Sequence, residues 1–257
     1  MANYLIDSMV WSHSRITSYL GCPYQFYLKY ICGEVERPMF FSDYGSLIHE
    51  LLARYYGGSA SISQVLNEYL CRFTDETSGS RVSGNIKASF FEQGVSLLKA
   101  LSPIPGEVLS IEEKVFFDIG DRQFIGFIDL VHRDENGALC ILDHKSRDLK
   151  PRSKRAKPTK TDMELDQYLR QLYLYAIPVA MKYGKNPDFL EFNCYRTGVR
   201  IKERFCPEKL EETKQWALQT IEQISAEKEW SPNVDSWRCR HLCGLSDVCD
   251  YYQMSEG

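Results

Sequence analysis

The chain has 257 residues, of which 44% are hydrophobic and 26% charged. This length and composition are typical of a folded protein with a sizeable core and exclude a disordered or fibrous chain. No stretch reaches the roughly 20 consecutive apolar residues of a membrane span, and residues 1–15 lack the pattern of a secretion signal, so we expect a cytoplasmic protein that does not contact membranes. The formal net charge of −4 excludes a uniformly basic nucleic-acid binder.

The first hundred residues are predicted to be helical, because their apolar side chains recur at spacings of three and four. Helices are expected over Ser14–Tyr30, Gly45–Tyr56, Ile62–Phe73 and Asn85–Leu101. Pro23 should break the first helix, since proline has no backbone N–H to donate. A connection rich in Thr, Ser and Gly at Thr77–Gly84 should separate the last two.

The middle of the chain changes to the pattern of strands. Segments rich in Val, Ile and Phe lie at Ile111–Ile119, Gln123–His132 and Ala138–Lys145. The turn signals Gly120-Asp121 and Asn136-Gly137 separate them, so we expect three consecutive antiparallel strands. They are followed by a helix over Met163–Lys182 containing Pro178, strands over Phe189–Thr197 and Val199–Phe205 joined at Gly198, and a helix over Pro207–Lys228. This order of helices and strands predicts an α/β protein.

Asp143 and Lys145 are the first candidates for chemistry. Successive side chains of a strand point to opposite faces, so these two share a face and His144 points away. A turn through Asn136-Gly137 would bring Asp129 beside Asp143. Carboxylates bind Mg²⁺, and a neighbouring lysine can orient water or stabilise charge on a phosphate, which is the chemistry of phosphodiester hydrolysis. The alternative is an ordinary ion pair at a strand end.

A series of motifs extends this site along the chain: His49 in GSLIHELL, Gly126-x-x-Asp129, Asp143-x-Lys145 and Gln171-x-x-x-Tyr175. In this order they resemble the PD-(D/E)XK nuclease superfamily. The similarity is greatest to its RecB-like branch, which includes the AddB-type nuclease domain and the CRISPR adaptation nucleases with an iron–sulfur cluster. The resemblance spans nearly the whole chain. It implies a restriction-endonuclease-like fold, a mixed β-sheet flanked by helices, with an N-terminal helical lobe.

The resemblance also implies roles for these residues. His49, Asp129 and Asp143 would bind Mg²⁺ or Mn²⁺, and Lys145 would assist attack by water. Gln171 and Tyr175 would lie near the active site and the DNA, and the alternative for them is a solvated helix edge.

Glu112 and Glu113 lie early in the first predicted strand, where either could assist a second metal ion. We favour Glu113, although the sequence does not fix which residues of the strand point inward.

Four cysteines form a candidate metal site. Cys239, Cys243 and Cys249 lie close together near the C-terminus, whereas Cys22 lies far away in the sequence. Four thiolates can hold a 4Fe–4S cluster or a zinc ion. The resemblance favours the cluster, because the iron–sulfur nucleases of this branch use one cysteine before the nuclease motifs and three after them. The spacing between Cys239 and Cys243, with His241 between them, is one residue longer than is common there, so zinc remains the alternative. The five other cysteines leave open that all nine are scattered thiols: Cys32, Cys71, Cys140, Cys194 and Cys206.

Positive charge is concentrated in residues 145–160, where eight Lys or Arg and one acidic residue give a net charge of +7. Such a segment can contact DNA phosphates, and the residues expected to do so are Lys150, Arg152, Lys154, Arg155 and Lys157. A solvated loop and a targeting signal are the alternatives.

The sequence therefore predicts a metal-dependent DNA nuclease. The resemblance implies an exonuclease that prefers single-stranded DNA and acts in recombination, repair or CRISPR spacer acquisition, with a helicase or a CRISPR integration partner. The alternatives are a non-catalytic iron–sulfur DNA-binding subunit and a nuclease that cuts RNA. We expect an N-terminal helical lobe over residues 1–105, a nuclease core over 106–230 and a cysteine-rich tail over 231–257 that packs on the lobe.

Overall fold

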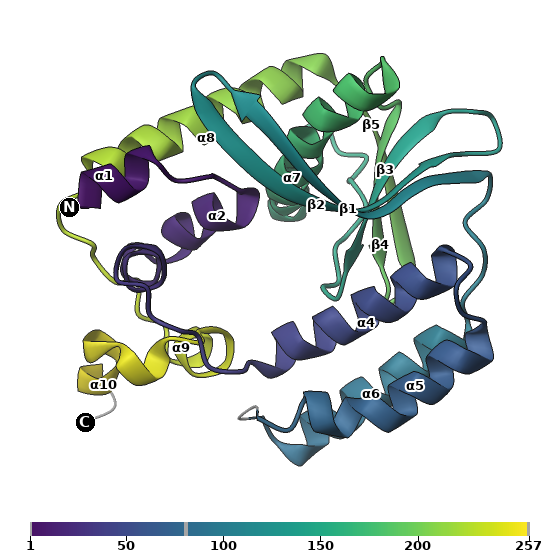
Figure 1. Ribbon diagram of the computed structural model, residues 1–257, viewed down its shortest axis with the longest axis horizontal. Coiled ribbons are helices and arrows are strands. Elements are labelled where there is room, and N and C mark those ends of the chain that lie inside the picture. Colours follow the sequence, from purple (N-terminus) through teal and green to yellow (C-terminus); the bar gives the residue numbers. More distant parts are fainter. Residues whose placement is uncertain (1, 80–81, 256–257) are drawn as a thin grey trace.

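A five-stranded mixed sheet forms the centre of the protein (Figure 1). The computed structural model describes residues 2–79 and 82–255, so positions 80 and 81 of the connection expected at Thr77–Gly84 lie outside the described residues. The strands are β1 (Glu107–Ile119), β2 (Arg122–Arg133), β3 (Leu139–Lys145), β4 (Phe189–Cys194) and β5 (Val199–Arg204). They lie side by side in sequence order. β3 and β4 pair in parallel, whereas the other neighbouring strands pair antiparallel. The expected α/β fold with a mixed sheet is confirmed.

The connection between β3 and β4 contains the long helix α7 (Lys160–Tyr183). Thr159 caps its first turn in a capping box with Asp162, and Gly184 ends it with a left-handed φ of 73°. Pro178 lies inside this helix, which nevertheless continues to Tyr183. α7 packs on one face of the sheet through buried side chains that include Leu169, Leu172 and Ala176.

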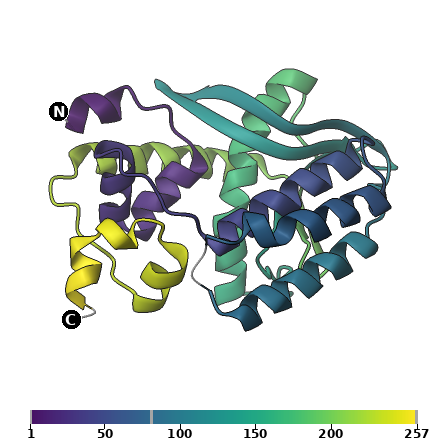
Figure 2. The same cartoon turned by 60° about the horizontal axis from the view of Figure 1, so that its bottom comes forward.

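Three helices form a second layer on the other side of β3 and β4 (Figures 1 and 2). They are α4 (Phe40–Tyr56), α5 (Ile62–Glu76) and α6 (Gly84–Lys99). α4 starts five residues before the helix expected at Gly45, because Phe40 and Tyr44 are buried in the core that the three helices share. Within the described part of the chain, no helix is both long and apolar enough to cross a membrane.

The N-terminal helices lie apart from this layer, on the side of the C-terminal tail (Figure 2). They are α1 (Ala2–Asp7), α2 (His13–Gly21), α3 (Pro23–Phe26) and the π-helix η1 (Tyr27–Ile31), and they share a core with α8 (Pro207–Ala226). The break expected at Pro23 is present, since α2 ends just before it. The tail consists of α9 (Ser236–Leu242), the 3₁₀ turn η2 (Ser246–Val248) and α10 (Asp250–Ser255). Residues 2–31 and 40–99 therefore pack in two separate cores.

Candidate active site

Three carboxylates lie in one row across β1, β2 and β3. In the antiparallel register of β1 and β2, Glu112 and Asp129 lie between the paired residues Ile111–Leu130 and Glu113–Ile128. Asp129 and Asp143 lie one residue beyond the last pair of β2 and β3, Leu130–Leu142. Asp129 and Asp143 are almost completely buried. The expectation that the Asn136-Gly137 turn brings these two aspartates together agrees with the register of the strands.

Glu112 has a backbone φ of 46°, the one positive value among the described residues other than glycine. Such a conformation is strained for a residue with a side chain, and it interrupts the alternation of side chains along β1. The Glu112 side chain lies in the cleft, with Oε1 3.9 Å from Nδ1 of His49. Glu113 instead accepts hydrogen bonds of 2.6 and 2.8 Å from Nζ of Lys182. The structure thus places Glu112 in the cleft beside His49 and Asp129, whereas Glu113, the residue favoured from the sequence, pairs with Lys182 instead.

His49 approaches the row from α4. Its Nδ1 lies 3.4 Å from Oδ2 of Asp129, and the ligand atoms of His49, Glu112 and Asp129 all lie within 4.8 Å of one another. The same oxygen of Asp129 accepts a 2.7 Å hydrogen bond from the backbone N–H of His144. One nitrogen and several carboxylate oxygens thus converge on one side of the cleft, which is a donor set that suits Mg²⁺ or Mn²⁺.

Lys145 connects the row to α7. Its Nζ lies 2.8 Å from Oδ2 of Asp143 and donates a 2.8 Å hydrogen bond to Oε1 of Gln171. Gln171 in turn donates a 3.0 Å hydrogen bond from Nε2 to the hydroxyl of Tyr175. The structure thus joins Lys145, Gln171 and Tyr175 in one chain of contacts, and these contacts hold the ammonium group in place.

Negative charge accumulates in this cleft. Burial raises the pKa of Asp143 to about 6, and the charge of Asp129 adds to the shift while Lys145 opposes it. Burial and then the charge of Asp129 raise the pKa of Glu112 to about 6. For Asp129 itself, burial would raise the pKa, but the hydrogen bond and charge of His49 lower it overall. Because a divalent cation stabilises closely spaced carboxylates in their ionised form, these residues fit such an ion.

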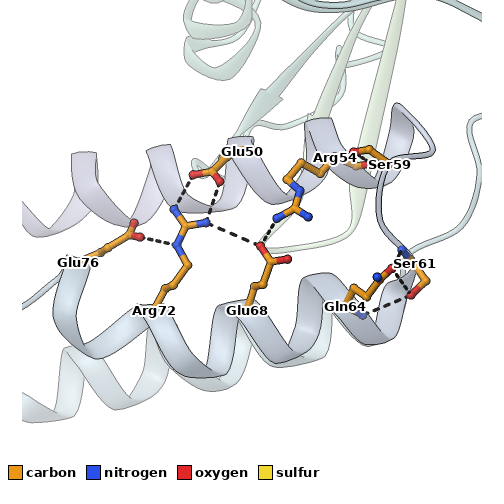
Figure 3. A network of polar contacts seen from close by, with 8 residues as sticks. All are labelled: Glu50, Arg54, Ser59, Ser61, Gln64, Glu68, Arg72 and Glu76. Atoms are coloured by element: carbon orange, nitrogen blue, oxygen red, sulfur yellow. Dashed lines mark hydrogen bonds and ion pairs between the residues drawn. The ribbon is translucent and has the colours of Figure 1, made fainter.

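A network of ion pairs holds α4, which carries His49, against α5 (Figure 3). Arg72 donates to both carboxylate oxygens of Glu50, at 2.7 and 2.5 Å, and to Glu76 at 2.6 Å. Arg54 pairs with Glu68 in the same network. The bidentate contact of Arg72 with Glu50, together with the Arg54–Glu68 pair, restricts the position of α4 more than a single surface ion pair would.

The four cysteines expected to hold a metal line one cavity between α3 and the tail: Cys22, Cys239, Cys243 and Cys249. Sγ of Cys22 accepts hydrogen bonds of 3.4 Å from the backbone N–H groups of Gln25 and Asn233. Burial raises the pKa of Cys243 and of Cys249, and charge on the neighbouring cysteines adds to both shifts. The four thiols line one cavity, with N–H donors aimed at one sulfur, but no three of the four sulfurs lie within 4.8 Å of one another. A single zinc ion needs closer sulfurs, because its Zn–S bonds are about 2.3 Å long, so this spacing suits an iron–sulfur cluster better.

The basic segment between β3 and α7 divides into two groups. Arg152 lies 2.7 Å from both Asp166 and Glu203, and Lys150 lies 2.7 Å from Asp148. The exposed side chains of the second group form no ion pair with any residue that the structure describes: Lys154, Arg155 and Lys157. Arg152 thus connects the segment to α7 and β5, and the second group is the part of the segment available to a phosphate backbone.

Comparison with known proteins gives a matching family and a similar fold. Residues 10–250 match the sequence profile of the PD-(D/E)XK nuclease superfamily. The fold is similar to that of a protein from Eubacterium rectale provisionally named an exonuclease, with 14% identity and a TM-score of 0.51 over 95% of this chain and 87% of that one. A second structure, of a protein named SSO0001, is 16% identical over 92% of this chain and 85% of that one, but its TM-score of 0.35 is too low to support an argument. No curated protein matches the chain.

Proposed function

The chain belongs to the PD-(D/E)XK nuclease superfamily, and we propose that it is a deoxyribonuclease that requires Mg²⁺ or Mn²⁺. One observation carries the proposal. A row of three carboxylates meets His49 on one side and Lys145 on the other, and all of them line a single open cleft. The alternative of a non-catalytic DNA-binding subunit would not require this complete set of residues.

In the proposed site, His49, Glu112, Asp129 and Asp143 would hold the divalent ions. When bound, such an ion neutralises phosphate charge and makes water a better nucleophile at neutral pH. The protein contributes the ammonium group of Lys145, which lies 2.8 Å from Asp143 and can donate hydrogen bonds to the attacking water or to an oxygen of the scissile phosphate. Gln171 holds Lys145 from the other side, so the ammonium group is oriented before the substrate binds.

We propose single-stranded DNA as the preferred substrate and cutting from an end as the preferred mode. This part of the proposal rests on the resemblance to the RecB-like branch, as does a role in recombination, repair or CRISPR spacer acquisition beside a helicase or integration partner. The exposed basic group of Lys154, Arg155 and Lys157 follows the strand that carries Lys145 and would contact the phosphate backbone.

For the cysteine cavity we propose a 4Fe–4S cluster, with zinc as the alternative. Cys22 belongs to the N-terminal helices and the other three ligands to the tail, so the metal would tie two distant parts of the chain together. The tail already contacts this region, since Nδ2 of Asn233 donates a 3.1 Å hydrogen bond to the carbonyl oxygen of Gly21. The role of the cluster would be structural.

The test is cutting of oligonucleotides labelled at the 5′ or the 3′ end, as single strands and as duplexes, in Mg²⁺, in Mn²⁺ and in EDTA. We expect shortening of the single strand in either metal and none in EDTA. Binding of DNA without cutting in both metals, with both strand forms, would support the non-catalytic subunit instead. Cutting of RNA but not of DNA would correct the substrate class.

A further inference from the structure

The β1–β2 hairpin has one buried face and one open face. Phe117 and Phe124 on the first face are buried in the core shared with the N-terminal helices and α8. Phe116 and Phe127 on the second face are 55% and 52% exposed. Phenylalanine side chains are usually buried, so two exposed rings on neighbouring strands of one hairpin call for an explanation.

The open face continues the catalytic cleft. Phe127 lies two residues before Asp129 on β2 and lines the same cleft as Asp143 and Lys145. Phe116 is the diagonal neighbour of Phe127 across the two strands, one step further from the row of carboxylates. Diagonal neighbours in a sheet lie roughly 7–8 Å apart, which is about twice the rise of roughly 3.4 Å between successive nucleotides of a strand.

A cation accompanies the two rings. Lys114 lies directly opposite Phe127 in the register of the hairpin, and its Nζ lies 5.2 Å from the centre of the Phe116 ring. Its side chain is exposed, and it forms no ion pair with an acidic residue within the described ranges. The face therefore combines two flat apolar surfaces with a positive charge available to a phosphate.

We propose that this face, made of Lys114, Phe116 and Phe127, binds the unpaired bases of the substrate strand next to the cleavage site. The inference rests on the proposed nuclease function and specifies how the substrate is bound. Phe127 and Phe116 stack on bases of the incoming strand, and Lys114 contacts its backbone. Stacking against the flat side of a base requires that the base is not enclosed in a duplex, and it works with any base, so the face selects single strands without selecting a sequence.

The composition of the face favours a nucleic acid over a protein partner. The apolar part of the face is small, since it consists of the two rings and Ile125, which lies directly opposite Phe116 and is half-buried. The exposed polar side chains of Asp118 and Gln123 bound it on one side. A stable protein interface buries roughly 800 Å² on each partner, more than three side chains supply, whereas a base needs only one exposed ring on which to stack.

The test compares binding of two probes, a fluorescein-labelled oligothymidine and an abasic strand of the same length, with Ca²⁺ in place of Mg²⁺. We expect the protein to bind the strand with bases more tightly. Phe116→Ala and Phe127→Ala should each weaken binding of oligothymidine about 5- to 100-fold and leave binding of the abasic strand unchanged. Phe127→Trp should retain tight binding, because it keeps an aromatic ring. Met181→Ala removes an even more exposed apolar side chain, on α7, and should change neither affinity.

The inference is overturned if the alanine variants bind oligothymidine as the parent protein does, or if they lose affinity for both probes equally. Circular dichroism of each variant checks that it folds; both rings are more than half exposed, so folding should be unaffected. Failure of the inference is distinguishable from failure of the nuclease proposal. In the first case the parent protein still cuts single strands in Mg²⁺ or Mn²⁺, and in the second case it does not cut them.

Discussion

Gly126 and Tyr175 pack so closely that a methyl group at position 126 would lie 2.6 Å from Cε1 of Tyr175. The glycine comes from β2, three residues before Asp129, and the tyrosine from α7. The Tyr175 hydroxyl accepts the hydrogen bond of Gln171, which in turn holds Lys145. The absence of a side chain at Gly126 therefore sets the position of Tyr175, and Tyr175 sets the position of Lys145 through Gln171.

Gly126→Ala should displace the Tyr175 ring and cost about 1–3 kcal/mol of unfolding free energy, the usual cost of overpacking. Cutting should weaken as well, because Gln171 loses its partner. Urea unfolding of the single and double variants measures the coupling. Combining Gly126→Ala with Tyr175→Ala should cost less than the sum of the two single changes, whereas combining it with Tyr175→Phe, which keeps the ring, should bring no relief. Additive costs with Tyr175→Ala would show that the contact is unimportant.

Glu112 and Glu113 form a matched pair for testing the metal site. Glu112→Gln should lower metal-dependent cutting about 10- to 100-fold, because it removes a charge from the row of carboxylates. Glu113→Gln should leave cutting unchanged, because Glu113 pairs with Lys182 outside the cleft. Initial rates over a range of Mn²⁺ concentrations distinguish the two variants. Equal loss in both would mean that Glu112 has no special role.

Asp143 should lower the stability of the metal-free protein at neutral pH. Its pKa is about 6 in the folded protein and 3.8 ordinarily, so the unfolding free energy falls as the pH rises from about 4 to about 6 and stays low above that range. Asp143→Asn should therefore stabilise the protein in EDTA at about pH 8 by at most about 3 kcal/mol, and by little at about pH 4. Thermal unfolding at both pH values measures this. An Asp143→Asn variant that is less stable than the parent protein at pH 8 would contradict this prediction.

Much of the active site could be predicted from local patterns. The alternation of a strand puts Asp143 and Lys145 on one face, and a short turn puts Asp129 beside Asp143. The position of Glu112 beside Asp129 could also have been predicted. The two-residue turn pairs Ile119 with Arg122, and counting back along both strands puts Glu112 opposite Asp129. The positive φ of Glu112 is what the regular alternation does not predict.

The arrangement of the helices could not be predicted in the same way. An amphipathic pattern shows that a helix has a buried face, but not which element covers it. The sequence therefore could not show that the helices of residues 2–31 pack against α8. It also could not show that the helices of residues 40–99 form a separate core. The exposure of Phe127 could not be predicted either, because both faces of this strand carry apolar residues, and the sequence does not show which face is covered by other elements.

Because four cysteines line one cavity, we expect the stability of the C-terminal tail to depend on a bound metal. Cys239→Ser should abolish the visible absorption of the anaerobically purified protein and its iron content. It should also lower the melting temperature and make the tail sensitive to protease, because the link to Cys22 is lost. Cys71→Ser is the control, since this exposed thiol lies on α5, away from the cavity. Zinc in place of iron in the parent protein would correct the identity of the metal, and no bound metal at all would contradict the site.

The central claim is that Lys145, held between Asp143 and Gln171, serves a metal-dependent cut of DNA. The most direct measurement is the initial rate at which the parent protein and Lys145→Ala cut labelled single-stranded DNA in Mn²⁺, with circular dichroism to confirm that both are folded. Loss of one oriented donor to a developing negative charge typically costs about 10²–10³ in rate, and we expect a loss of at least this size. A folded Lys145→Ala variant that cuts at the parental rate would contradict the account.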